Sequence, residues 1–178
     1  MLNKSFIAAT IVLATSAIAF GFQLPSDWVS FNSPEGRFSV SMPNKPADDV
    51  KDVDSVVGKL QLHSFTSSNA VAYFMVSYGD YPNEPTVDRR EKVLDGVRDG
   101  VISGLEGSSL ISETKTTIDG YPGREFLAKQ TVDGDELIFA WHVYLVGPRL
   151  YQVAAVAKKS DSTSPEITKF FNSFRLTN

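Results

Sequence analysis

Apolar residues occupy both the odd and the even positions of the segment from Glu136 to Val146. A strand with one solvated face alternates apolar and polar residues, so this segment is expected to be buried on both faces. The same is expected of its partner, residues 150–157, across the turn at Gly147 and Pro148. Further strand-like segments, each bounded by Gly, Pro, Asn or Asp, are residues 28–31, 37–42, 59–65, 70–78, 112–118 and 124–132. The pattern predicts a strand-rich domain.

Two amphipathic helices are expected to cover this sheet. Thr86 can cap a helix that runs to about Leu105, and Ser164 can cap a second helix whose first position is Pro165. The buried stripes would consist of Val93, Leu94, Val97, Val101 and Leu105 in the first helix and Ile167, Phe170, Phe171 and Phe174 in the second. The predicted fold class is α+β, with an antiparallel β-sheet covered by helices on both faces as an α/β/α sandwich.

The amino-terminal segment has the pattern of a signal peptide. Lys4 is followed by an apolar core over residues 6–14 and by the small residues Ala17 and Ala19, which predict cleavage after Ala19. A retained membrane anchor is the alternative, although Thr10 interrupts a stretch already short for a span. The expected organisation is a signal peptide over residues 1–19 and a single domain over residues 20–178. The expected location is the periplasm, the thylakoid lumen or the extracellular space.

Charge and composition exclude several classes of function. The 178 residues include 17 Lys plus Arg and 21 Asp plus Glu, so the formal net charge is -4. The longest basic runs are the pairs at residues 89–90 and 158–159, which argues against nucleic acid as the main partner. The chain has no cysteine, which excludes disulfides, thiolate nucleophiles, thiolate metal sites and a lipoprotein anchor.

The candidate chemistry is sparse. His63 and His142, the only histidines, fall in predicted strands without the spaced ligands of a zinc site, and are interpreted as core or rim residues. The acidic cluster at residues 48–54 is interpreted as a solvated loop. No catalytic residue, metal or cofactor is predicted, and the chain is not expected to be an enzyme. The alternative is a hydrolase using His63 or His142, which requires an imidazole in a cleft within about 3 Å of a carboxylate or hydroxyl.

Two segments have the character of a binding surface. Tyr78 and Tyr81 flank the start of a Pro-rich loop. Tyrosine side chains provide a large contact area and lose little conformational entropy on binding, because they have few rotatable bonds. Tyr121 and Arg124 belong to a glycine-rich turn, in which Gly123 is expected to allow a positive φ. For the first segment, the alternative is that the tyrosines fold back over the start of the helix. For the second, the alternative is that hairpin geometry alone explains the turn.

Four sequence boxes resemble those of PsbP-like exported proteins. They are the Trp28 to Pro46 box, the Gly120-Tyr-Pro-Gly-Arg-Glu125 turn, the Tyr144-Leu-Val-Gly-x-Arg-Leu-Tyr151 hairpin and Phe171-Asn-Ser-Phe174. The resemblance implies the α/β/α sandwich shared with Ran-binding Mog-type proteins, but not an activity. We expect a non-enzymatic extracytoplasmic domain that binds a protein partner or a small ligand, without stable membrane insertion after cleavage. The alternative within this family is an extrinsic subunit associated with a photosystem.

Overall fold

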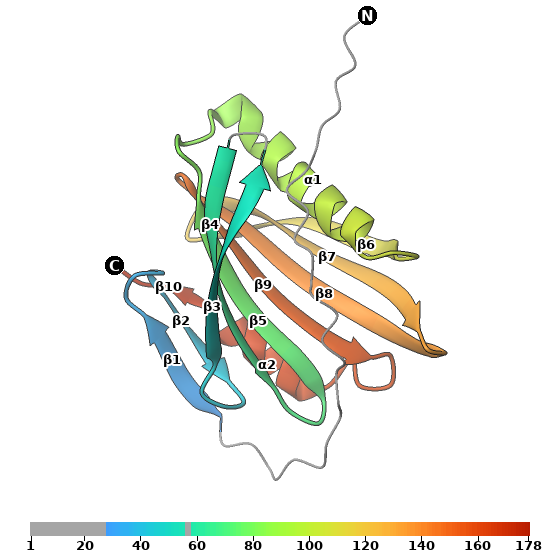
Figure 1. Ribbon diagram of the computed structural model, residues 1–178. Helices are drawn as coiled ribbons and strands as arrows, with labels where there is room; N and C mark the ends of the chain where they lie inside the picture. Colours follow the sequence, from blue (N-terminus) through green and yellow to red (C-terminus); the bar gives the residue numbers. More distant parts are fainter. Residues whose placement is uncertain (1–27, 56–57) are drawn as a thin grey trace, which may run out of the picture.

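Antiparallel strand pairing organises most of this chain. The computed structural model describes residues 28–55 and 58–178. Within these ranges, seven strands form one sheet in the order β3-β4-β5-β9-β8-β7-β6, and three short strands form a second sheet in the order β1-β2-β10 (Figure 1). The strands are β1 (Val29–Ser33), β2 (Phe38–Met42), β3 (Ala47–Ser55), β4 (Gly58–Ser68), β5 (Ala72–Asp80), β6 (Ser109–Ile118), β7 (Tyr121–Val132), β8 (Asp135–Val146), β9 (Arg149–Lys158) and β10 (Arg175–Leu176).

Two-residue turns set the register of the strands that follow α1 (Val87–Gly104). Asp119 and Gly120 connect β6 to β7, with φ values of 49° and 83°. Asp133 and Gly134 connect β7 to β8, with φ values of 51° and 87°. Turns with positive φ at both central residues match the twist of antiparallel strands, so each hairpin closes without a slip in register. Which side chains share a face is therefore decided at these turns.

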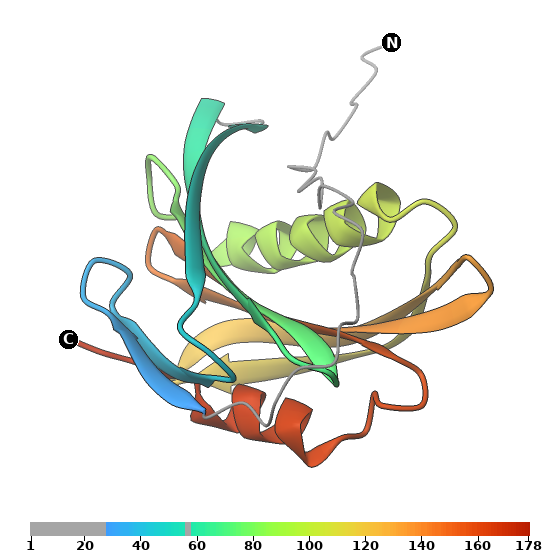
Figure 2. The same ribbon diagram turned by 60° about the horizontal axis from the view of Figure 1, so that its bottom comes forward.

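Both predicted helices are confirmed, with small differences at their starts. α1 begins after Thr86, but the Thr86 side chain makes no capping hydrogen bond. α2 (Pro165–Ser173) begins as expected, because the Ser164 hydroxyl accepts a hydrogen bond from the Glu166 backbone N–H at 3.3 Å. α1 and α2 lie on opposite sides of the large sheet (Figure 2).

The two faces of the large sheet are covered by different kinds of layer. On one face α1 packs on β7 and β8, burying Leu94 against Phe126 and Trp141. On the other face the small sheet contributes the core residues Phe38, Val40 and Met42, and α2 contributes Ile167 and Phe170. β9 is consequently buried on both faces, as its sequence predicts, whereas β8 is buried on the face towards α1 and only partly buried at Ala140 and His142 on the other face.

The prediction of an α/β/α sandwich is wrong. Helix makes up 18 residues in α1 and nine in α2, and strands predominate in the described residues. One face is covered largely by the β1-β2-β10 sheet, which one buried and one partly buried hydrogen bond attach to β9. The Tyr151 hydroxyl donates to the Gly36 carbonyl at 2.7 Å, and the Arg149 guanidinium donates to the Glu35 carbonyl at 2.7 Å. The fold is therefore β-rich, with two antiparallel sheets and two helices in the described part of the chain.

The acidic segment and the amino-terminal segment need separate comment. The acidic segment that we interpreted as a loop is the edge strand β3, because Ala47–Ser55 pairs along its length with β4. Asp48, Asp49 and Asp52 of this strand are exposed. The predicted signal peptide and its cleavage residues Ala17 and Ala19 lie outside the described residues. Among the helices of residues 28–55 and 58–178, none has the length and apolarity needed to cross a bilayer.

A network of ion pairs attaches α1 to β6 and β7. Arg124 of β7, whose side chain is 5% exposed, lies 2.6 Å from the Glu91 carboxylate, 3.1 Å from that of Asp95 and 3.2 Å from that of Glu113. Arg98 of α1 also contacts Glu113, at 2.6 Å. The buried guanidinium has its charge balanced by carboxylates from both elements, so the network fixes the helix on this end of the sheet.

Replacing Arg124 with alanine is expected to destabilise the fold by about 2 kcal/mol. The substitution leaves three carboxylates facing one another, and the partial exposure of those carboxylates keeps the effect below that of a fully buried pair. Urea unfolding followed by circular dichroism measures the difference. The exposed pair of Lys159 and Glu136 provides the control, since Lys159→Ala should change the free energy of unfolding by about 0.5 kcal/mol or less. Equal effects of the two substitutions would contradict this role for Arg124.

The same network predicts how stability depends on pH. Hydrogen bonds from Arg124 and then from Lys115 lower the pKa of Glu91 from 4.5 to about 2. Since the carboxylate is favoured in the folded state, its contribution is complete above about pH 4.5 and is lost as the pH falls towards 2. The unfolding free energies of the native chain and of Glu91→Gln should therefore converge over this interval. A difference that stays constant from pH 6 to about pH 2 would refute the assignment.

Candidate functional site

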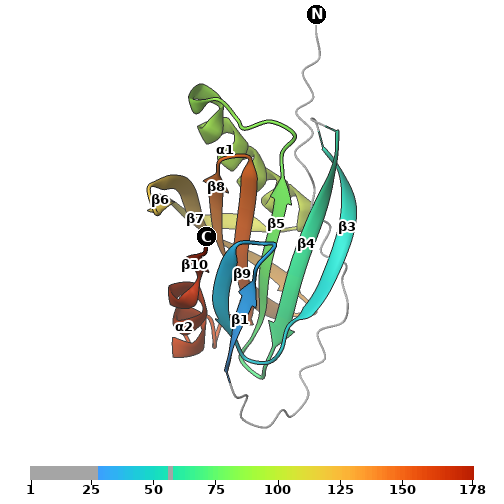
Figure 3. The same cartoon turned by 90° about the vertical axis from the view of Figure 1, so that its left-hand side faces the viewer.

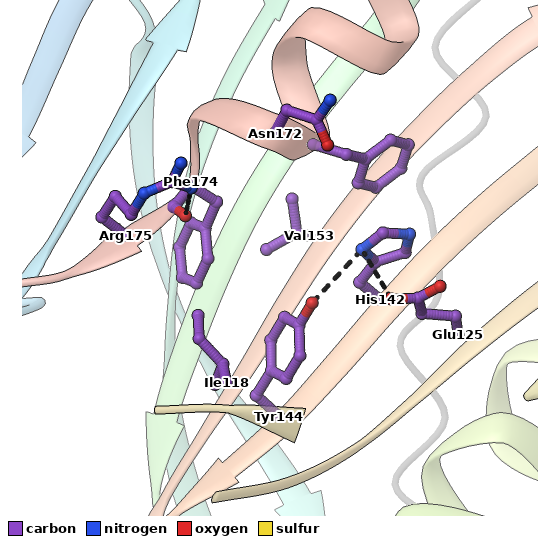
Figure 4. A pocket seen from close by; sticks show the side chains of 9 residues that line it. Ile118, Glu125, His142, Tyr144, Val153, Asn172, Phe174 and Arg175 are labelled. Carbon is purple, nitrogen blue, oxygen red and sulfur yellow. Dashed lines mark hydrogen bonds and ion pairs between the residues drawn. The ribbon is translucent and has the colours of Figure 1, made fainter. Parts of the chain in front are cut away.

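A pocket with a volume of about 430 Å³ lies between the large sheet and the end of α2. Figure 4 shows side chains from several strands and from the end of α2 converging on this space. The residues that line it are Ile118, Glu125, His142, Tyr144, Val153, Phe171, Asn172, Phe174 and Arg175. Aromatic and aliphatic groups thus form walls around a small set of hydrogen-bonding groups.

Strand register brings the polar groups of the pocket together. Glu125 of β7 is directly opposite His142 of β8, and His142 is directly opposite Val153 of β9. Directly opposed residues project from the same face of an antiparallel sheet. Because Trp141 and Val143 belong to the core under α1, their neighbour His142 projects towards α2.

A glycine makes room for the tyrosine of the pocket. Gly123 is directly opposite Tyr144, and a Cβ at position 123 would lie 2.6 Å from Tyr144 Cδ1 and 2.6 Å from the Val143 carbonyl oxygen. The expectation that Gly123 adopts a positive φ is wrong, because the positive φ values of this turn belong to Asp119 and Gly120. Gly123 instead permits the close approach of the Tyr144 ring to the backbone of β7.

His142 is held between an aromatic ring and two polar groups. Its imidazole stacks on Phe171, with ring centroids 4.0 Å apart and an angle of 22° between the planes. Its Nδ1 lies 3.3 Å from the Tyr144 hydroxyl and 3.8 Å from the Glu125 carboxylate (Figure 4). Burial lowers the pKa of His142, and the nearby Glu125 carboxylate opposes that shift without cancelling it. The imidazole is therefore mainly neutral at pH 7 and can both donate and accept a hydrogen bond.

Tyr144 is kept protonated by its surroundings. Burial, with a further contribution from the Glu125 carboxylate, raises the pKa of Tyr144 to about 12. The ring stacks on Phe174 at a centroid distance of 6.1 Å with 4° between the planes. A phenol in this state donates or accepts a hydrogen bond but is a weak nucleophile. The Glu125 side chain, 41% exposed, adds a carboxylate acceptor beside these two groups.

The arrangement suits recognition through hydrogen bonds and aromatic contact. Within residues 28–55 and 58–178, no three His, Cys, Asp or Glu side chains are grouped so that they could hold a metal ion. Among the described residues lining the pocket, none is a serine, threonine or cysteine. The pocket therefore offers acceptors, donors and ring faces rather than an evident nucleophile.

The tyrosines at residues 78 and 81 do not meet at one surface. Tyr78 is 3% exposed, stacks on His63 at 4.6 Å, and has the Arg149 guanidinium 4.4 Å from its ring centroid. Tyr81 packs against the core beneath α1, and burial raises its pKa. Its backbone N–H donates to the Pro148 carbonyl at 2.9 Å. Tyr81 thus packs near the helix, as in the alternative that the sequence left open, whereas Tyr78 belongs to the core on the opposite face of the sheet.

The other two predicted binding residues are also separated. Tyr121 is 42% exposed at the start of β7, and Arg124 lies in the ion-pair network under α1. None of the four lines the pocket. A binding role for the exposed Tyr121 stays a prediction, and the geometry gives it no connection to His142.

Sequence reasoning did not identify Glu125 and the aromatic residues of α2 as parts of a site. A usable signal exists for Glu125, since a two-residue Asp-Gly turn at positions 133–134 aligns it with His142 by counting outwards from the turn. Phe171 and Phe174 were assigned to a buried helix face. The sequence alone does not show that a pocket remains beside them.

Comparisons with known proteins find a distant likeness of fold. No protein-family model matches the chain, and no curated protein matches it in sequence. A protein of unknown function from Pseudomonas aeruginosa, PA94, is 14% identical with a TM-score of 0.45, covering 79% of this chain and 90% of that one. LpqN, involved in cell envelope biogenesis of Mycobacterium tuberculosis, is 15% identical with a TM-score of 0.49, covering 88% of this chain and 82% of that one. Membership of the PsbP-like family stays a prediction.

The protonation of His142 can be measured directly. The pKa of His142 should lie below 6.5, and Glu125→Gln should lower it further by removing the charge that favours the imidazolium. Proton NMR titration of the imidazole signals measures both values, and His142→Gln assigns the signal, since the chain has only two histidines. A pKa above 6.5, or an upward shift in Glu125→Gln, would contradict the described environment.

Proposed function

We propose that this chain is a non-enzymatic, exported binding protein that holds a small ligand in the pocket between α2 and β8. The observation that carries the proposal is the convergence of His142, Tyr144 and Glu125 within a space walled by aromatic rings. Ligand pockets commonly have volumes of roughly 300–1,000 Å³. The volume of this pocket, about 430 Å³, falls within that range, and its accessible lining is more polar than apolar.

The lining indicates what such a ligand carries. Phe171, Phe174 and Val153 favour an aromatic or aliphatic body. The Glu125 carboxylate and the imidazole of a neutral His142 accept hydrogen bonds, so the ligand is expected to present at least one N–H or O–H donor. Because the His142 imidazole is largely buried, a hydrogen bond from the ligand to it contributes more to the binding free energy than the same bond would in open water.

Hydrolysis is the second candidate, and the proximity of Glu125 to His142 favours it. A carboxylate beside an imidazole can orient a general base. Against this reading, the Glu125 oxygen is 3.8 Å from Nδ1, and the hydroxyl beside that nitrogen belongs to Tyr144, whose pKa is about 12. We therefore favour recognition over catalysis.

The sequence supports the exported part of this proposal. The basic residue, apolar core and small residues of positions 1–19 support secretion. The photosystem-associated alternative predicts that the protein co-purifies with a membrane complex. High salt should then release the protein, because salt screens the charge interactions that hold a peripheral subunit.

A fragment screen by NMR tests the binding function. Small aromatic and aliphatic amines, amides and alcohols should shift the amide signals of Glu125, His142 and Tyr144. His142→Ala should weaken binding about tenfold, the effect of losing one hydrogen bond of about 1.4 kcal/mol. His63→Ala is the matched control, since His63 stacks on Tyr78 outside the pocket and its loss should leave affinity unchanged.

Three results would contradict the binding proposal. They are the absence of any binding fragment, shifts confined to another surface, and equal loss of affinity in the two histidine variants. Ester hydrolysis that disappears in His142→Ala would establish the second candidate instead.

A further inference from the structure

β6 forms one margin of the large sheet and is open along its outer edge. It pairs with β7 on one side, and no other strand of the described ranges pairs with it (Figure 3). Eight of its ten residues are exposed and the other two are partly exposed. An outer strand of this length presents a row of backbone donors and acceptors that can pair with another strand.

The two margins of the sheet differ in how they discourage such pairing. β3, at the opposite margin, carries Asp48, Asp49 and Asp52 against the single base Lys51, so its excess of negative charge opposes pairing with a second copy of the same strand. β6 carries one acid and one base, Glu113 and Lys115, and has no proline. Its Thr114, Thr116 and Thr117 are β-branched and favour extended backbone. β6 therefore lacks the protection that β3 has.

The sequence of β6 is complementary to itself. In an antiparallel pair centred on Thr114, Glu113 of each copy is opposite Lys115 of the other, and Ser112 is opposite Thr116. Oppositely charged residues in direct cross-strand positions stabilise a pair, whereas a parallel pair in register would place like charges together. We propose that β6 is a docking edge for a second copy of this chain, and that the two large sheets join antiparallel through β6 about Thr114.

Glu113 and Lys115 already have ion-pair partners within each copy. Glu113 is held by Arg98 at 2.6 Å, and Lys115 lies 2.6 Å from Glu91, so both project towards α1. The Lys115 side chain is 74% exposed and accessible to a second carboxylate. The joined edges would extend the network of α1 across the dimer axis. The irregularity between Leu110 and Ser112 limits the paired stretch to the residues that follow it, so a weak, concentration-dependent dimer is expected.

The lack of cysteine makes the register testable by cross-linking. In the proposed pair the two residues at position 114 are opposite each other, with Cβ atoms about 4.5–5.5 Å apart, close to disulfide range. Thr114→Cys should therefore form covalent dimers under mild oxidation. Thr117→Cys, on the same strand, is the matched control, because its two copies would lie about 20 Å apart at roughly 3.3 Å per residue. We expect at least fivefold more cross-linked dimer from Thr114→Cys.

Sedimentation velocity of the unmodified chain provides an independent measurement. The dimer fraction should rise with concentration, and Lys115→Glu should abolish it by placing like charges opposite each other. Lys129→Glu, at an exposed position of β7, makes the same charge change away from the edge and should have no effect. Circular dichroism checks that each variant is folded. A chain that stays monomeric without cross-linking at position 114 would overturn the proposal, as would dimers that form through Asp52→Cys in β3.

Discussion

The register between β7 and β8 is the constraint on which the rest of the structure depends. Asp133 and Gly134 close this hairpin with positive φ at both residues, and the pairing then runs without a bulge to Gly123 and Tyr144. This register places Phe126 opposite Trp141 under α1 and Glu125 opposite His142 facing α2. Because side chains alternate along a strand, a slip of one residue would exchange the core and the pocket between the faces.

The two faces use their neighbours differently. Under α1, the Arg124 guanidinium is ion-paired with three carboxylates beside the buried aromatic core. On the opposite face the small sheet and α2 together do not fill the space beside β7 and β8, and the pocket occupies what they leave. The short length of α2 thus has a functional consequence, because Phe171 and Phe174 become walls of the pocket rather than core alone.

Local signals in the sequence anticipated much of the fold. The strand near Trp141, the helix start at Ser164 and the turn at Gly147 and Pro148 depend on nearby residues and were predicted correctly. The burial of β8 on its second face is only partial. The small sheet was missed because β10 has two residues and pairs with β2 from far along the chain. The α/β/α prediction failed for that reason: it assigned to helices a face that strands largely cover. Arg124 was misplaced because the facing carboxylates of Glu91 and Asp95 are about 30 positions away in sequence.

The register can be measured directly from contacts between strands. In antiparallel strands, NOEs between Hα atoms connect alternate pairs of directly opposed residues. The account predicts that such contacts join Glu125 to His142 or the adjoining pair Phe126 and Trp141. A contact joining Glu125 to Trp141 or to Val143 would show a slipped register, and would contradict both the pocket and the arrangement of the core.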